Sequence, residues 1–206
     1  MVRMIFYVLF ILSCLHIQAQ EISAPKPTLP NSFVGDIELQ LATGEKMIPV
    51  LDSINGMFRY RIADEFVSKT RYQIFVSNDD HAYVYVIGSD LRNQVSRWFP
   101  LSGDINAAMT YGQNHMAIPD ETYYMEMDDT PGTDYMCVLY SKDALDIDGI
   151  VEKIKSANGN FYNKLKYAIA DRMVPTKDIR YVLNNIGFSA RTDKTIVPVI
   201  VEIGHK

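Results

Sequence analysis

Runs of apolar and aromatic residues, separated by clusters of turn-forming residues, predict strands in the middle of the chain. Residues 72–76 form one such run, and the turn formers at 77–80 separate it from a second run at 82–87. Because successive side chains of a strand point to opposite faces, Val84 and Val86 face one way and their odd-numbered neighbours face the other. The second run is therefore apolar on both faces, which predicts a central strand of a packed sheet.

One-faced strands are predicted on both sides of this segment, where apolar and polar residues alternate. Proline lacks a backbone donor, so Pro49 predicts an edge strand at 47–51, and Pro198 predicts an edge or a bulge within 195–203. The alternation further predicts strands at 37–41, 58–62 and 123–127, and a fully apolar run predicts one at 135–140.

The period of the apolar residues becomes helical after Asp146. Two stripes follow and end before Pro175, and both are typical of helices that face a core. They consist of Ile147, Ile150, Val151 and Ile154, and of Phe161, Leu165, Ala168 and Ile169. We therefore predict a mainly β (α+β) fold: a single antiparallel β-sandwich-like domain at 36–206, with about eight to ten strands and a two-helix insertion at about 147–173 before the C-terminal strands.

The first twenty residues have the features of a signal peptide. Arg3 supplies a positive charge, residues 4–12 form a short apolar segment, and small or polar residues lead to Ala19 and Gln20. The apolar segment is too short to span a bilayer comfortably. We predict cleavage after Ala19 or Gln20 and export to the periplasm, the cell surface or the medium.

Cys14 offers an alternative, because lipoprotein processing there would leave a chain anchored to a membrane by lipid. Residues 21–35, rich in proline, are predicted to form an extended tether. Once a leader cleaved near residue 20 is gone, Cys137 is the only cysteine, so no internal disulfide is predicted. The net charge of −5 gives no positive field for nucleic acid or anionic lipid, so neither is predicted as a partner.

Several of these landmarks together resemble one bacterial family, the domain of unknown function numbered 4384. The matching pieces are 78–86 (NDDHAYVYV), 98–100 (WFP), 118–119 (IP) and 132–141 (GTDYMCVLYS), with 197–203 (VPVIVEI) as a companion. Ala82 and Trp98 stand where the family pattern has glycine and leucine. The resemblance implies an accessory β domain of exported or envelope-associated proteins, joined elsewhere to peptidase-like or kinase-like modules, and it implies no catalytic residues.

Two groups of residues invite a chemical interpretation, and a structural one is favoured for each. Cys137 with His81 or His115 could act as nucleophile and base. However, Cys137 lies in an apolar run, where free cysteine behaves as a small hydrophobic residue. The acidic turns at 78–80 and 128–134 could offer oxygen ligands to Ca²⁺, but their spacing matches no calcium loop, and turns recruit Asp and Asn for backbone reasons.

Aromatic residues are the most suggestive candidates for ligand binding. Tyr83, Tyr85, Trp98 and Tyr124 come from neighbouring predicted strands and, on one exposed face, would form a platform for a sugar or an extended peptide. The favoured alternative is that they fill the second side of a two-layer core. The predicted sheet edges offer a further docking mode, which is strand addition.

No catalytic or phosphate-binding motif is present: the chain has no Gly-x-Ser-x-Gly, P-loop or His-Glu-x-x-His sequence. We therefore predict a non-catalytic binding or interaction module of the bacterial cell envelope that holds a protein partner, without cofactor or metal. One alternative is a carbohydrate-binding or adhesin-like surface domain whose partner is a surface glycan. A weaker alternative is a hydrolase with an unrecognised site.

Overall fold

The computed structural model describes residues 30–54, 56–90, 94–103, 105–110 and 115–206. The predicted signal peptide, Cys14 and residues 21–29 of the tether lie outside these residues. The first strands are β1 (Asn31–Leu41), β2 (Pro49–Ile54), β3 (Met57–Phe66), β4 (Arg71–Asn78), β5 (Ala82–Ser89), β6 (Val95–Phe99), β7 (Ala108–Met109), β8 (Met116–Ile118), β9 (Met125–Glu126) and β10 (Gly132–Ser141). After them come the helices α1 (Ile147–Ser156) and α2 (Phe161–Ile169), short 3₁₀ turns at Ala170–Arg172 and Thr176–Asp178, and the strands β11 (Ile179–Tyr181), β12 (Ile186–Thr192) and β13 (Ile196–His205).

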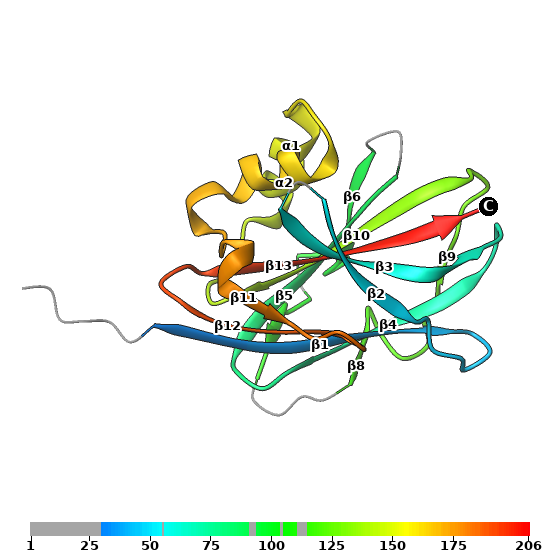
Figure 1. The fold of residues 1–206 in the computed structure, drawn as a ribbon, viewed down its shortest axis with the longest axis horizontal. Coiled ribbons are helices and arrows are strands. Elements are labelled where there is room, and N and C mark those ends of the chain that lie inside the picture. Colours follow the sequence, from blue (N-terminus) through cyan, green and yellow to red (C-terminus); the bar gives the residue numbers. More distant parts are fainter. Residues whose placement is uncertain (1–29, 55, 91–93, 104, 111–114) are drawn as a thin grey trace, which may run out of the picture.

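These strands form two sheets, which confirms the predicted sandwich-like α+β fold (Figure 1). Sheet A has the order β11-β12-β1-β4-β8, and β9 also pairs with β4. Sheet B has the order β2-β3-β13-β10-β5-β6, and β7 also pairs with β5. One pair departs from the predicted antiparallel arrangement, because β13 runs parallel to β3, with Val201 opposite Tyr60.

The middle strands of sheet B, β5, β10 and β13, are buried on both of their faces. One face packs against sheet A, in a core that includes Ile74 of sheet A and Val84 of sheet B. The other face packs against the two helices, in a core that includes Ile87, Cys137 and Ile154. This arrangement explains why β5 is apolar on both sides, and it confirms the prediction of a central strand there, because β10 and β6 flank it.

The helix pair lies between β10 and β11 in the chain, as predicted, and covers the outer face of sheet B (Figure 1). Asp146 caps α1 by accepting a hydrogen bond from the Gly149 N–H at 3.0 Å, and Asn160 caps α2 by accepting from the Asn163 N–H at 3.0 Å. None of the helices in the described ranges combines the length and the hydropathy that crossing a membrane requires.

Three details of the strands differ from those predicted. β1 begins at Asn31, so the last five residues of the predicted tether at 21–35 belong to a strand, and Phe33 continues the buried alternation of that strand. Pro198 is not on an edge strand: β13 is an inner strand, but it pairs with β3 only from Val201 onwards, so the missing N–H of Pro198 removes no hydrogen bond to β3. The described residues contain thirteen strands rather than eight to ten, because several are two or three residues long.

Candidate functional site

The outer edge of β2 is a free sheet edge. β2 pairs with β3 on one side, where Val50 lies opposite Arg61 and Ile54 opposite Met57, and no strand in the described ranges pairs with its other side. Its position confirms the edge predicted from Pro49. An unpaired edge offers a row of N–H and C=O groups that another extended chain can pair with.

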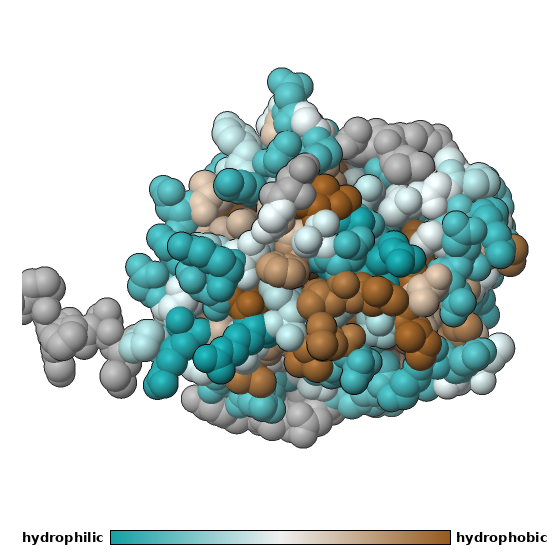
Figure 2. All heavy atoms as spheres, in the orientation of Figure 1, coloured by the Kyte–Doolittle hydropathy of each residue, from teal (hydrophilic) through white to brown (hydrophobic). Residues whose placement is uncertain are grey.

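Exposed apolar side chains surround this edge. They come from β2 and the residue before it, from the start of β3 and from the turn between β11 and β12, and between 39% and 70% of each residue's surface is exposed. We call this set the β2 patch: Ile48, Val50, Ile54, Phe58, Val182 and Leu183. Figure 2 shows apolar residues gathered on the face of the molecule that carries β2 and β11 in Figure 1. Apolar side chains that cluster on a surface typically mark an interaction site.

Ring contacts and one buried hydroxyl fix the position of the β2 patch. The Phe58 ring lies 5.3 Å from the Tyr181 ring, centroid to centroid. The Tyr60 hydroxyl lies 2.6 Å from the Gly187 carbonyl oxygen and 2.9 Å from that of Val182, and it accepts a hydrogen bond from the Val182 N–H at 3.2 Å. These contacts tie the β11–β12 turn of sheet A to β3 of sheet B, so the patch spans both sheets.

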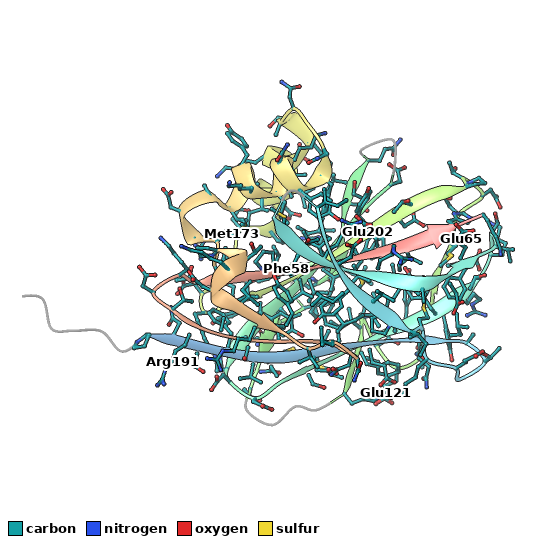
Figure 3. All side chains as sticks on the ribbon, in the orientation of Figure 1. Phe58, Glu65, Glu121, Met173, Arg191 and Glu202 are labelled. Atoms are coloured by element: carbon teal, nitrogen blue, oxygen red, sulfur yellow. The ribbon has the colours of Figure 1, made fainter. Side chains whose placement is uncertain are left out.

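A groove of about 890 Å³ lies beyond the tip of the β2–β3 hairpin. Gly56 and Met57 form its hairpin side, and α2 with the segments that follow it forms the other side. Figure 3 labels Met173, from this groove, and Phe58, from the β2 patch. The Thr176 hydroxyl donates to the Gly56 carbonyl oxygen at 3.1 Å and joins the two sides.

The groove carries an excess of positive charge. Lys166, Lys177 and Lys194 line it against a single acid, Asp171, and none of the three lysines has an ion-pair partner in the part of the chain that the structure describes. Ala170, at the end of α2, also lines it and has a φ of 28°, which a residue with a Cβ rarely adopts. Such strained residues are concentrated at functional sites. We call this feature the lysine groove.

A buried charged group supports β3 from the helix side of sheet B. The Arg59 Nε lies 2.7 Å from the Glu202 Oε2, and only 8% of each side chain is exposed. The Tyr162 hydroxyl, from α2, donates a short hydrogen bond to the other oxygen of Glu202. Arg59 also pairs with Asp52 of β2 at 3.2 Å. The ion pairs therefore connect β2, β3 and β13, and Tyr162 connects them to α2; Figure 3 labels Glu202.

The four candidate aromatic residues do not share one exposed face. Tyr83 and Tyr85 face the helix side of sheet B, where Tyr85 is buried and its hydroxyl accepts from the Leu145 N–H at 2.8 Å. Trp98 packs against the core on the opposite face, and its ring lies close over Gly88. Tyr124 precedes β9 of sheet A, with the Arg71 guanidinium 4.7 Å from its ring centre. Tyr83 and Tyr85 share one surface, but Trp98 and Tyr124 lie on two others, because the strands belong to different sheets or the side chains face different cores.

The other candidates occupy structural positions. Cys137 is fully buried in the core beneath the helices, and burial raises the pKa of its thiol, which keeps it protonated. The Asn78 side chain donates to the Asp80 carbonyl oxygen, and Asp128 accepts from the Thr130 N–H, so these turn residues hold their own backbone. Among the described residues, no group of three His, Cys, Asp or Glu side chains is placed to hold a metal ion.

One Ser–His–Asp group was not predicted. The Ser68 Oγ lies 3.1 Å from Nε2 of His205, and the nearest oxygens of Asp128 and Asp134 lie 3.8 and 3.9 Å from Nδ1. Those two distances exceed a hydrogen bond, and a working triad needs the acid to hold the imidazole. The His205 side chain is also fully buried, so a substrate cannot reach it. The group does not supply the hydrolytic site of the weaker alternative.

The chain matches no family model, no curated protein and no solved structure. The resemblance to the domain of unknown function numbered 4384 therefore stays a prediction.

Proposed function

We propose that the chain is a non-catalytic binding module of the bacterial envelope that holds a protein partner by strand addition at β2. The free outer edge of β2, inside the β2 patch, is the observation that carries this proposal. Natural edge strands are usually protected by charges, bulges or proline. β2 has Pro49 at its start and Asp52 near its middle, but Val50 and Ile54 are exposed on it. This edge is thus only partly protected against pairing.

The partner segment that fits this surface is extended and apolar at alternate positions. Its backbone would pair with β2, and its apolar side chains would cover the β2 patch, since side chains of an added strand alternate between two faces. A segment that continued past Ile54 and the hairpin tip would reach the lysine groove. Carboxylates at that end of the segment would complement Lys166, Lys177 and Lys194.

The glycan-binding alternative has less support. It depended on an aromatic face shared by all four residues, and only Tyr83 and Tyr85 share a surface, while Trp98 and Tyr124 lie on two others. Export, which places the module in the envelope, is part of the proposal and depends on the predicted signal peptide at residues 1–20.

A peptide-display selection tests the proposal directly. Random twelve-residue peptides are selected against the chain from residue 21 onwards, and the enriched peptides are titrated against variants. We expect Val50→Lys and Ile54→Lys to weaken binding at least tenfold, because each places a charge on the β2 patch. Leu101→Lys is the matched control, because Leu101 is exposed to a similar extent and is not part of the β2 patch. It should leave the affinity unchanged.

Amide hydrogen exchange identifies the mode of binding. A peptide added as a strand should slow exchange most at the Leu51 amide, because pairing protects the N–H groups on the free edge. Alternate residues of β2 bond to β3, Pro49 has no N–H, and the Ser53 N–H already donates to the Asp52 carboxylate at 2.7 Å. Selected peptides that protect another segment, or that bind the Val50→Lys and Ile54→Lys variants as tightly as the original chain, would show that β2 is not the docking edge.

A further inference from the structure

A second cleft, of about 430 Å³, lies between the helix side of sheet B and the start of α1. Tyr83 and Tyr85 of β5 and Arg97 of β6 line its sheet side, and Asp146 and Asp148 line its helix side. Small-molecule sites typically have volumes of about 300–1,000 Å³, so this cleft is large enough for a ligand. Among the described residues, it shares none with the lysine groove or the β2 patch. We call it the tyrosine cleft.

A buried hydroxyl in the tyrosine cleft has an unused proton. Tyr85 is 4% exposed, and its hydroxyl accepts a hydrogen bond from the Leu145 N–H at 2.8 Å. Leu145 also lines the cleft, so this bond holds the hydroxyl at the cleft wall. Burial raises the pKa of Tyr85, so the hydroxyl keeps its proton at neutral pH. No residue in the described ranges accepts that proton, and buried polar groups are normally satisfied, so the position indicates an acceptor from outside the chain.

Tyr83 places a second hydroxyl on the same surface. It lies two residues before Tyr85 on β5, so both side chains point to the helix side of sheet B. The His81 ring packs edge-on against the half-buried Tyr83 ring, with 5.4 Å between the ring centres, and this contact fixes the ring. The Tyr83 hydroxyl likewise has no acceptor in the part of the chain that the structure describes. The two tyrosines therefore offer two donors beside an accessible aromatic ring.

Other walls of the tyrosine cleft offer a free carboxylate oxygen and a fixed guanidinium. Arg97 donates to the Asp148 Oδ2 at 2.9 Å and to the Leu101 carbonyl oxygen at 3.0 Å, and these bonds hold its side chain in place. The Asp148 Oδ1 accepts from no described residue, so it remains available to a ligand. The Asn106 Oδ1 accepts from the Ala108 N–H at 2.9 Å, which leaves the Asn106 Nδ2 as a donor. Donors and an acceptor therefore surround one cleft.

A neutral ligand with several hydroxyl groups fits these walls better than an ion does. Arg97 is already paired with Asp148, and Asp146 adds a second carboxylate, so an anion is disfavoured. The described residues hold no group of His, Cys, Asp and Glu placed for a metal ion. A hydroxyl group donates and accepts at once, so it can donate to Asp148 and accept from a tyrosine. The apolar face of a sugar ring can also pack on the Tyr83 ring.

We propose that the tyrosine cleft binds a neutral sugar residue. Tyr83 and Tyr85 donate to its hydroxyl oxygens, Asp148 accepts from one of its hydroxyl groups, and the Tyr83 ring packs against its ring. This site needs only the two tyrosines that share a surface. A free sugar and a sugar unit of a polysaccharide both present this chemistry. The proposal goes beyond strand addition at β2 and does not depend on it, because the two sites have no described residue in common.

A titration followed by nuclear magnetic resonance tests the proposal on the chain from residue 21 onwards. The probes are the methyl glycosides of glucose, galactose, mannose and N-acetylglucosamine, and a tetrasaccharide of each. The control ligand is 2-methoxytetrahydropyran, which has a similar ring and no hydroxyl groups. We expect at least one sugar to shift the Leu145 amide resonance saturably, because that N–H bonds to the Tyr85 hydroxyl. A tetrasaccharide that binds more tightly than its glycoside would identify a polysaccharide as the source, and equal binding would identify a free sugar.

Substitutions locate the binding. Tyr83→Phe and Tyr85→Phe each remove one hydroxyl and keep the ring, so each should weaken the sugar affinity at least fivefold. Tyr123→Phe is the matched control and should leave the affinity unchanged, because Tyr123 is exposed and does not line the cleft. Tyr85→Phe also removes the acceptor of the Leu145 N–H, so thermal melting checks its folding, and Tyr83→Phe decides alone if that variant does not fold.

The charge of the ligand is tested by salt. Raising the salt concentration from 50 to 500 mM should leave the affinity unchanged, because a neutral sugar has no charge to screen. Four outcomes would each overturn the proposal: no saturable shift with any of the sugars up to about 50 mM, an equal response to 2-methoxytetrahydropyran, unchanged affinity in a folded tyrosine-cleft variant, or binding that weakens steeply with salt.

Discussion

At the scale of single residues, Arg59 and Glu202 show how an alternating pattern can hide a buried charge. The alternation of Phe58, Tyr60 and Ile62 with two arginines predicts a strand with one apolar and one exposed polar face. Arg59 is instead buried, because α2 covers that face of sheet B. The sequence shows that apolar and polar residues alternate along β3, but it does not show which strands lie beneath the helices. The ion pair with Glu202 was therefore not predictable from it.

Removing one member of this pair should be costly. We expect Glu202→Gln to lower the free energy of unfolding by about 3 kcal/mol, because it leaves the Arg59 charge buried without its partner. Urea unfolding measures the change. Glu65→Gln, at an exposed acid at the end of β3, should change the stability by no more than about 0.5 kcal/mol.

A double variant tests whether the cost of Glu202→Gln comes from the unpaired Arg59 charge or from lost packing. Arg59→Met with Glu202→Leu removes both charges and keeps apolar volume, so it should be more stable than Glu202→Gln alone. If Glu202→Gln costs no more than Glu65→Gln, then Asp52, which also contacts Arg59, compensates the arginine and Glu202 is not its essential partner.

At the scale of elements, the helix pair was the most predictable part of the fold, because local signals determine it. The two apolar stripes lie within thirty residues, although α2 ends at Ile169, well before Pro175. Short strands were less predictable. The alternation at 123–127 predicts a five-residue strand, yet β9 contains only Met125 and Glu126, because its length depends on where β4 offers a partner.

The cap of α1 gives a prediction at this scale. Asp146→Ala should lower the free energy of unfolding by about 1 kcal/mol, because the Gly149 N–H loses its acceptor and the α1 terminus loses a favourable negative charge. Chemical denaturation, with far-ultraviolet circular dichroism for helix content, measures it. Asp146→Asn, which keeps an acceptor oxygen, should recover most of the stability. An equal loss in both variants would contradict the capping role.

At the scale of the whole molecule, the order of the strands in the two sheets determines which distant residues lie together, and the sequence does not show that order. Pro49 locates one free edge correctly, so part of the proposed docking surface was predictable. The β2 patch also needs Val182 and Leu183, more than a hundred residues away, and only the pairing of β11 with β12 brings their turn beside β3. Likewise Tyr83 and Trp98 are close in sequence but face different cores, which a strand pattern alone does not show.

Buried tyrosines in both sheets predict how stability responds to alkaline pH. Burial raises the pKa of Tyr60 from 10.0 to about 12, and burial also raises the pKa of Tyr72, Tyr140 and Tyr181. The folded chain therefore holds these protons more tightly than the unfolded chain does. The stabilising contribution is fully present below pH 10 and is lost as the pH rises, for Tyr60 over the window from about 10 to about 12.

Urea unfolding between pH 9 and 12 tests this linkage. We expect the free energy of unfolding to fall ever more steeply above pH 10, and Tyr60→Phe to reduce that slope, because the variant has no proton to lose at this position. Tyr60→Phe also removes the hydroxyl contacts to Val182 and Gly187, so it should be less stable than the original chain at pH 9. Tyr167→Phe, at an exposed tyrosine, serves as the control and should leave the slope unchanged. A Tyr60→Phe slope equal to that of the original chain would show that the Tyr60 hydroxyl titrates alike in the folded and unfolded states and would contradict this linkage.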